Sequence, residues 1–277
     1  MMTKIHDTAD TPQWQRLAGA AIGGGEARMT RHQITRVRHE TRRRTLTVDR
    51  IEDVTPGMRR IHFTCADLAD FASAGFDDHV KMFIPGPVAP GERGMMRDFT
   101  PRRFDQAAGT IAIDYALHDA GPAVAWAIAA RPGDSLEIGG PRGSAIIADD
   151  FDWYWFIGDA TALPAIGRRL EELRDGVPAV SFVLVDSPAE AQEIVTQTDW
   201  TPHWVVRSGS DDAANLIAAT ADVPLPRGDG FIWIAAEAGV ARAVRTAIEA
   251  RGHPRAWLKA SGYWQRGDEG VHVKIED

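Results

Sequence analysis

Three arginines, an aromatic ring and a hydroxyl lie within one eight-residue stretch, Arg97-Asp98-Phe99-Thr100-Pro101-Arg102-Arg103-Phe104. Guanidinium groups suit a pyrophosphate, an aromatic side chain can stack on a planar ring, and a hydroxyl can hydrogen-bond a ring nitrogen. In an extended segment Arg97 and Phe99 share one face and Arg102 the other, so a twist or turn must bring them around one ligand. The stretch is consistent with a flavin dinucleotide site, and equally with an edge strand that carries solvated arginines.

A second stretch suited to a ligand is Gly158-Asp159-Ala160-Thr161-Ala162-Leu163-Pro164, which follows an apolar run and leads into a helical pattern. Ligands of open α/β sheets bind outside the carboxyl ends of the strands, where backbone N–H groups and the Thr161 hydroxyl could meet a phosphate or ribose. The stretch lacks a G-x-G-x-x-G fingerprint. A plain strand–helix turn with Thr161 as the N-cap explains the same residues.

Two kinds of structure must position these stretches. Short apolar alternations between Gly and Pro turns predict an antiparallel barrel or sandwich from about 44 to 147. Its strands are expected at 45–51, 59–64, 79–84, 110–117 and 135–138, with one helix at 123–130. Alternating strands and helices then predict a doubly wound parallel sheet. Its strands are expected at 153–157, 180–185, 204–206, 231–235 and from 256 onward, and its helices at 163–174, 212–220 and 240–251. We therefore predict a disordered extension at 1–30 and two domains, at 31–148 and 149–277.

Composition excludes several classes of protein. The net charge of -8 over 277 residues argues against nucleic acid as the main partner. A single cysteine, Cys65, rules out an intrachain disulfide, an all-cysteine zinc site and an iron–sulfur cluster within one chain. No apolar run reaches the roughly 18 residues of a membrane span, and we find no secretory signal. We expect a cytoplasmic protein with no membrane insertion and no metal bound by its own side chains.

Six segments resemble, in the same order, the motifs of siderophore-interacting proteins, which are NAD(P)H-dependent ferric-siderophore reductases of the ferredoxin-reductase superfamily. The stretch at 97–104 is similar to their R-x-Y-T-x-R-x-F pattern, and the others are 77–85, 113–127, 140–144, 158–166 and 261–267. This resemblance runs from about 45 to 266. It implies a β + α/β fold, an N-terminal antiparallel β-barrel FAD domain followed by a doubly wound parallel-sheet NAD(P)H domain. It also implies a protein that takes electrons from NADH or NADPH through FAD and releases iron from a ferric siderophore as Fe(II). We expect this protein to be a monomer.

The resemblance assigns roles to residues of this chain. It places Thr100 near the reactive flavin nitrogen, and makes it the one residue close to the chemistry. The expected FAD contacts are Arg97, Phe99, Thr100, Arg102, Asp114, Tyr115, His118, Gly121, Pro122, Ala123 and Trp126. The expected NAD(P)H contacts are Gly158, Asp159, Thr161, Ala162, Pro164, Asp186, Arg207 and Glu237. The expected siderophore contacts are the cations Lys81, Arg142, Lys259 and Arg266.

Several questions stay open at this point. Phe99 replaces a usual tyrosine, Val124-Ala125 stand where Ser-Arg is usual, and Ala160 replaces Glu or Gln; we interpret these as changes that tune FAD affinity. Asp186 favours NADH, because a carboxylate can bond a ribose 2′-hydroxyl, whereas Arg207 favours NADPH. The alternatives to ferric-siderophore reduction are a flavin reductase with another acceptor, a non-catalytic siderophore-binding protein and a nucleotide-sensing module.

Overall fold

The computed structural model describes residues 31–86, 94–117, 121–209, 211–267 and 273–274. Residues His32–Asp277 form one compact unit. The predicted extension at 1–30 and the predicted site residue His118 lie outside the described residues. Within the described ranges, no helix has the length and apolar character needed to cross a membrane.

The first sheet has seven strands, all paired antiparallel, in the order β5-β4-β8-β2-β3-β7-β6. They are β2 (Arg43–Thr55), β3 (Met58–Thr64), β4 (Val80–Phe83), β5 (Met96–Phe99), β6 (Pro101–Asp105), β7 (Thr110–Ala116) and β8 (Ser135–Gly139). Alternate side chains point inward, as Leu46 and Val48 do in β2, and form one apolar core. The helix α2 (Pro122–Ala129) packs on this core through Ala123 and Ala127.

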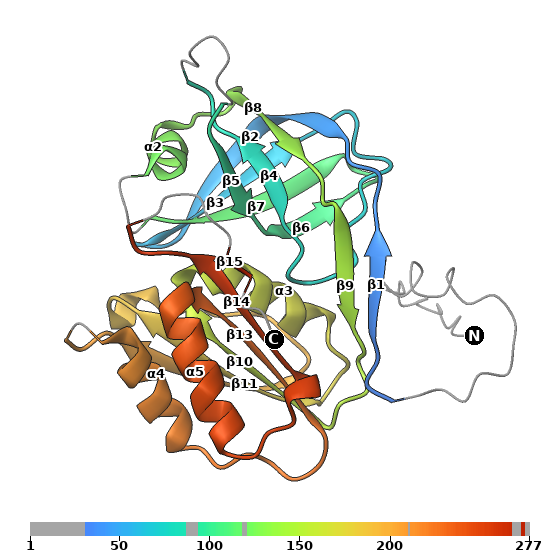
Figure 1. Cartoon of the computed structure of the whole chain (residues 1–277). Coiled ribbons are helices and arrows are strands. Elements are labelled where there is room, and N and C mark those ends of the chain that lie inside the picture. The colour runs from blue at the N-terminus through green and yellow to red at the C-terminus, as the bar shows by residue number, and fades with distance from the viewer. Residues whose placement is uncertain (1–30, 87–93, 118–120, 210, 268–272, 275–277) are drawn as a thin grey trace, which may run out of the picture. The chain divides into compact units, whose positions relative to one another are not determined.

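The second sheet has the order β12-β11-β10-β13-β14-β15 (Figure 1). Its strands are β10 (Trp153–Asp159), β11 (Pro178–Val185), β12 (Asp199–Val206), β13 (Gly230–Glu237), β14 (Leu258–Trp264) and β15 (Val273–Lys274). All adjacent pairs are parallel except β14–β15. Every residue of β10 is buried, as expected for a strand covered on both faces.

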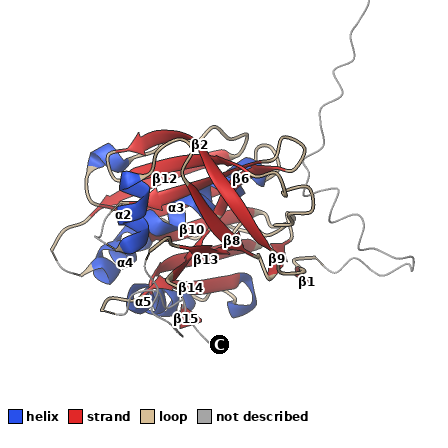
Figure 2. Ribbon diagram, turned by 90° about the horizontal axis from the view of Figure 1, so that it is seen from above, coloured by secondary structure: helices blue, strands red, loops and turns tan. Residues whose placement is uncertain are grey.

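Helices cover both faces of this second sheet (Figure 2). One face, which includes Tyr154 and Phe156, packs against α3 (Leu163–Glu172). The other face, which includes Trp155, packs against α4 (Asp212–Ala221) and α5 (Ala238–Ala250). The predicted fold class, an antiparallel barrel followed by a doubly wound sheet, is therefore confirmed.

A third, two-stranded sheet was not predicted. In it β1 (Ile34–Arg38) pairs antiparallel with β9 (Gly143–Ile147). Since β9 ends at Ile147 and β10 begins at Trp153, the predicted boundary falls in the connection between them. Met58 and Phe76 of the N-terminal region join the apolar cluster under α3, so the two predicted domains share one core. Hydrogen bonds from Arg102 to Glu171 and from Arg168 to the Pro101 carbonyl oxygen fix the barrel motif 97–104 relative to α3.

Candidate active site

Aromatic rings from three elements meet at one end of the barrel. The Phe99 ring lies 4.7 Å from that of Tyr115 on β7, and the Tyr115 ring lies 6.2 Å from that of Trp126 on α2. Tyr115 is fully buried, donates its hydroxyl to Met82 Sδ, and has a pKa raised well above the ordinary value by burial. Phe99 and Trp126 are only partly buried. The ring surface that a ligand could reach therefore belongs to Phe99 and Trp126, with Tyr115 as their support.

Thr100, the predicted reactive-site hydroxyl, lies directly after Phe99 and is buried. The carbonyl oxygen of the next residue, Pro101, accepts from Arg168 Nη1 of α3 at 3.3 Å. Thr100 therefore stands where the two predicted domains meet. This is the position from which a barrel residue could touch both a flavin and a nucleotide.

The start of α2 has the properties of an anion site. No side chain of the described residues caps it, and no acidic residue lies in its first turn, which favours a phosphate at its first N–H groups. A Cβ on Gly121 would meet no atom within 4 Å among the described residues, so packing alone does not require glycine there. Asp98 Oδ1 is buried and has no hydrogen-bond partner in the described part of the chain. The half-buried Arg97, the partly exposed rings and the N–H groups of this helix start fit FAD, whereas Asp98 alternates to the opposite face of β5.

Arg59 of β3 holds the opposite end of α2. Its Nη1 donates to the carbonyl oxygens of Ala127 and Ile128 at 3.2 and 3.1 Å. Its Nε and Nη2 donate to Asp53 at 2.7 and 3.3 Å. The helix has no basic residue of its own in its last turn, so Arg59 supplies the charge that the C-terminal dipole favours.

Replacing Arg59 with methionine is expected to weaken FAD binding about tenfold, because α2 loses two hydrogen bonds that fix its orientation. Fluorescence titration of apoprotein with FAD measures this. Arg50→Met is the matched control, since Arg50 is an exposed arginine of the neighbouring strand paired with Glu52. An unchanged FAD dissociation constant in Arg59→Met would show that α2 does not hold the cofactor.

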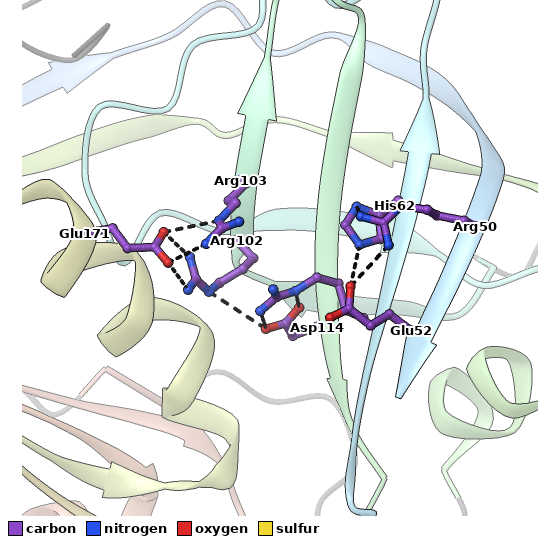
Figure 3. Close-up of polar contacts among 8 residues, drawn as sticks. Arg50, Glu52, His62, Arg102, Arg103, Asp114 and Glu171 are labelled. Atoms are coloured by element: carbon purple, nitrogen blue, oxygen red, sulfur yellow. Dashed lines mark hydrogen bonds and ion pairs between the residues drawn. The ribbon is translucent and has the colours of Figure 1, made fainter. Parts of the chain in front are cut away.

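Arg102, the second predicted phosphate ligand, is engaged elsewhere (Figure 3). Its Nη1 and Nη2 donate to Glu171 of α3 at 2.7 and 2.6 Å, and Arg103 donates to the same carboxylate. A Cβ on Gly167 of α3 would come within 2.7 Å of Arg102 Nη2, so the missing side chain makes room for the guanidinium. Arg102 therefore ties the barrel motif to α3, and its contact with FAD stays a prediction.

Asp114, another predicted FAD residue, is buried opposite Arg60 on the neighbouring strand β3. Arg60 donates to its two oxygens at 2.6 and 2.8 Å, and Arg102 Nε lies 3.9 Å from Asp114 Oδ2. The carboxylate thus balances two buried guanidinium groups. In the structure Asp114 thus lies next to the guanidinium of Arg102, a residue of the motif.

Asp159 joins three strands of the second sheet at their carboxyl ends. Its Oδ1 accepts from the Thr161 N–H at 2.9 Å and from the Thr161 hydroxyl at 2.5 Å. Its Oδ2 accepts from the Glu237 N–H at 3.1 Å and from Trp264 Nε1 at 2.8 Å. The capping residue of this turn is therefore Asp159, which precedes the 3-10 turn η1 (Ala160–Ala162), and not Thr161.

Other predicted nucleotide residues are packed into the turn itself. A Cβ on Gly158 would lie 2.3 Å from the Ala235 carbonyl oxygen and 2.6 Å from the Ala162 Cβ, so only glycine fits between β10 and β13. Ala162 is fully buried, and Pro164 is buried in the first turn of α3. These residues shape the strand end.

The predicted residues at the other strand ends bond to protein groups. Glu237 caps α5, with Oε2 accepting from the Gly239 and Val240 N–H groups at 2.6 and 3.1 Å. Asp186 and Arg207 form an ion pair with each other. They come from adjacent strands, which places both at the edge where a nucleotide would lie.

The four predicted siderophore cations differ in their carboxylate partners. Lys81 lies beside Gly139 in the barrel and pairs with Asp98 at 2.7 Å, while Arg142, just beyond Gly139, is exposed and has no side-chain partner among the described residues. Lys259 pairs with the buried Asp77 at 2.6 Å. Arg266 lies 3.8 Å from Asp212, on the nucleotide side. Lys81 and Arg142 thus both lie near Gly139 in the chain's barrel part, and their contact with a siderophore stays a prediction.

A buried carboxyl connects two of the predicted motifs. Asp78 Oδ2 accepts from the hydroxyls of Ser73 and Ser144 at 3.0 and 2.6 Å and from the Gly75 N–H at 3.0 Å. Burial raises the pKa of Asp78 to about 6, against the opposing effect of the Ser144 hydrogen bond. The segments around 78 and 144 are held together by a group that titrates below neutrality.

Asp78 should make the stability depend on pH in a defined direction. Because the folded pKa exceeds the unfolded value of 3.8, the folded state binds the extra proton, and stability is lost as the pH rises from about 4 to 6. A shift of two units corresponds to about 3 kcal/mol. Asp78→Asn cannot ionise, so its free energy of unfolding relative to the wild type should rise by this amount between pH 4 and 7. Denaturant unfolding at both pH values measures it, and a constant difference would contradict the account.

Sequence reasoning missed most partners of the predicted residues. Glu171 carries no motif signal, and only the fold brings it to Arg102. The Arg60–Asp114 pair could have been found, because antiparallel pairing of the strands at 59–64 and 110–117 in this register places the two residues opposite each other.

Both halves of the chain match models of known protein families. A family model described as "Siderophore-interacting protein" matches residues 151–267, and one described as "Siderophore-interacting FAD-binding domain" matches 47–92 and 87–145. The chain is 34% identical over 247 residues to the NADPH-dependent ferric-chelate reductase of Escherichia coli (strain K12), covering 83% of this chain and 95% of that protein. It is 26% identical to the ferric vibriobactin reductase ViuB of Vibrio cholerae, covering 83% and 92%.

Among solved structures, a siderophore utilization protein from T. fusca is similar to the chain with a TM-score of 0.79 and 32% sequence identity. The match covers 86% of this chain and 98% of that one. Both halves of the described fold are therefore shared with that protein, barrel and parallel sheet together.

Proposed function

The chain belongs to the siderophore-interacting protein family, and we propose that it reduces ferric siderophores with electrons from NAD(P)H through bound FAD. The observation that carries this proposal is the meeting of the barrel motif with α3 of the parallel-sheet region, where Arg102 donates two hydrogen bonds to Glu171. Relatives named ferric-chelate reductase and ferric vibriobactin reductase support it.

FAD would lie against the ring surface of Phe99 and Trp126, with its phosphates at Arg97 and the uncapped start of α2. When bound, FAD supplies the conversion of a two-electron donor into one-electron transfers to Fe(III). Thr100, the buried residue that follows Phe99, would hydrogen-bond the reactive edge of the ring. Tyr115 would support this ring surface from the barrel core.

NAD(P)H would bind at the carboxyl ends of β10, β11 and β13. Asp159, with its four hydrogen bonds, holds the turn after β10 and the Trp264 side chain in fixed positions. Overall, one NAD(P)H gives two electrons and reduces two ferric chelates, with release of NAD(P)+, a proton and two Fe(II). Fe(II) binds hard oxygen ligands more weakly than Fe(III), so iron leaves the siderophore.

An anionic ferric siderophore would approach Lys81 and Arg142. Arg142 is exposed and has no side-chain partner among the described residues, so its charge is available to a ligand. Lys81 is partly neutralised by Asp98, and Lys259 by Asp77. We assign Arg142 the larger contribution to affinity. We further propose a cytoplasmic monomer, since reduced nicotinamides are available there and one chain supplies all the expected contacts.

Anaerobic turnover tests the proposed activity. Purified holoprotein is mixed with NADH or NADPH and a ferric siderophore, and Fe(II) is followed with a ferrous-specific chelator. Two Fe(II) for each nucleotide oxidised would support the proposal. Siderophore binding without Fe(II) formation would favour the non-catalytic binding protein, and nucleotide oxidation only with other acceptors would favour a different reductase.

A further inference from the structure

Coenzyme choice is the question that Asp186 and Arg207 leave open in the sequence, and the structure bears on it. Asp186 follows β11 and Arg207 follows β12, and these strands pair in register up to Val185 and Val206. The Arg207 N–H donates to the Val185 carbonyl oxygen at 2.9 Å. The two side chains therefore stand next to each other at the strand ends, where the ribose 2′ position of a nicotinamide nucleotide is read.

The Arg207 guanidinium is held by two carboxylates. Its Nη1 pairs with Asp186, and its Nε donates to Asp212 Oδ1 at 3.2 Å. Asp212 is the buried first residue of α4, whereas the Asp186 side chain is 61% exposed. Asp212 thus holds the guanidinium on its buried side, and Asp186 covers it on its solvent-exposed side.

Charge decides what this arrangement can bind. Two carboxylates face one guanidinium, and Arg266 lies 3.8 Å from Asp212 with its side chain 69% exposed, so it neutralises the group only weakly. A 2′-phosphate would have to displace Asp186 and would then meet acidic surroundings. A 2′-hydroxyl adds no charge and can donate to the Asp186 carboxylate.

We propose that Asp186 sets the coenzyme preference of this chain by masking Arg207, so that the protein prefers NADH and becomes an NADPH acceptor when Asp186 is neutralised. The inference rests on the proposed function and adds a specificity-determining pair to it. An arginine guanidinium is not deprotonated in proteins, so Arg207 stays charged when Asp186 no longer covers it.

Two probes that differ only in the 2′-phosphate test the proposal without turnover. Calorimetry measures the binding of 5′-AMP and of adenosine 2′,5′-bisphosphate to the wild-type holoprotein and to Asp186→Asn. The wild type should bind 5′-AMP at least as tightly as the bisphosphate. Asp186→Asn should bind the bisphosphate at least about tenfold tighter than the wild type does, while its affinity for 5′-AMP stays within about threefold.

Three comparisons make the test specific. Asp186→Asn/Arg207→Met should lose the gain, and Asp222→Asn, which removes an exposed charge at the end of α4, should show none. The rates of flavin reduction by NADPH and NADH should shift in the same sense as the probes. A wild-type preference for the bisphosphate, or no shift in Asp186→Asn, would overturn the inference. Failure of both nucleotides to reduce the flavin would instead refute the proposed function.

Discussion

Replacing Glu171 with alanine is expected to lower the free energy of unfolding by about 3–5 kcal/mol, because it leaves a buried charge without its partner. Arg102 is almost completely buried and gives two hydrogen bonds to this carboxylate. Without Glu171, its nearest carboxylate oxygen is that of Asp114 at 3.9 Å, and Asp114 is already paired with Arg60. Denaturant unfolding followed by tryptophan fluorescence measures the loss.

The matched control for this variant is Glu137→Ala, which removes an exposed carboxylate paired with Arg43 and should cost less than about 1 kcal/mol. Burial would raise the pKa of Glu171, but the hydrogen bonds from Arg102 and Arg103 lower it overall. Stability from Glu171 is therefore present above the unfolded pKa of 4.5 and lost as the pH falls through the lower folded value. Equal losses in both variants would contradict the role of Arg102 as a link to α3.

Replacing Arg97 with alanine is expected to weaken FAD binding about 100-fold, since a charge-assisted hydrogen bond to a phosphate contributes roughly 2–3 kcal/mol. Arg97 is half-buried beside the ring surface of Phe99, and its assignment to the cofactor phosphate comes from the motif. Quenching of flavin fluorescence on titration of apoprotein gives the dissociation constant. Arg97→Lys should recover part of the affinity, as a point charge without the planar fork.

Arg103→Ala is the control from the same motif, because Arg103 is exposed and its guanidinium forms an ion pair with Glu171. Its FAD affinity should stay within about threefold of the wild type, a difference below 1 kcal/mol. If Arg97→Ala retained full FAD affinity while Arg103→Ala or Arg102→Ala lost it, the phosphate would be held by a different arginine of the motif.

The periodicity of apolar residues in the sequence predicted the strands that bury one or both faces. β10 and β13 are runs of apolar and glycine residues up to their last residues, Asp159 and Glu237, and the helix at 163–172 carries its apolar residues on one face. These elements were therefore predictable. β1 was missed because four of its five residues are exposed and its partner β9 lies about 110 residues away. The predicted strand start at 256 is wrong, since the 3-10 turn η3 (Arg255–Trp257) precedes β14.

The candidate site was predictable as a set of segments and much less as a set of contacts. The motif around Arg97 and the turn at Asp159 could be found because ligand-binding chemistry constrains their residue types locally. The bonds of Arg102 to Glu171 and of Lys259 to Asp77 join positions 69 and 182 residues apart. Such pairs depend on how the barrel packs on α3 and β14, which no local pattern records.

The most direct test of the central claim is the anaerobic visible spectrum of the FAD-loaded protein during stepwise addition of its substrates. The account predicts that NADH or NADPH bleaches the bound-flavin absorption and that a ferric siderophore restores it, with two Fe(II) formed for each flavin reoxidised. Failure to retain FAD, or bleaching that no ferric siderophore reverses, would contradict the assignment of this protein as a ferric-siderophore reductase.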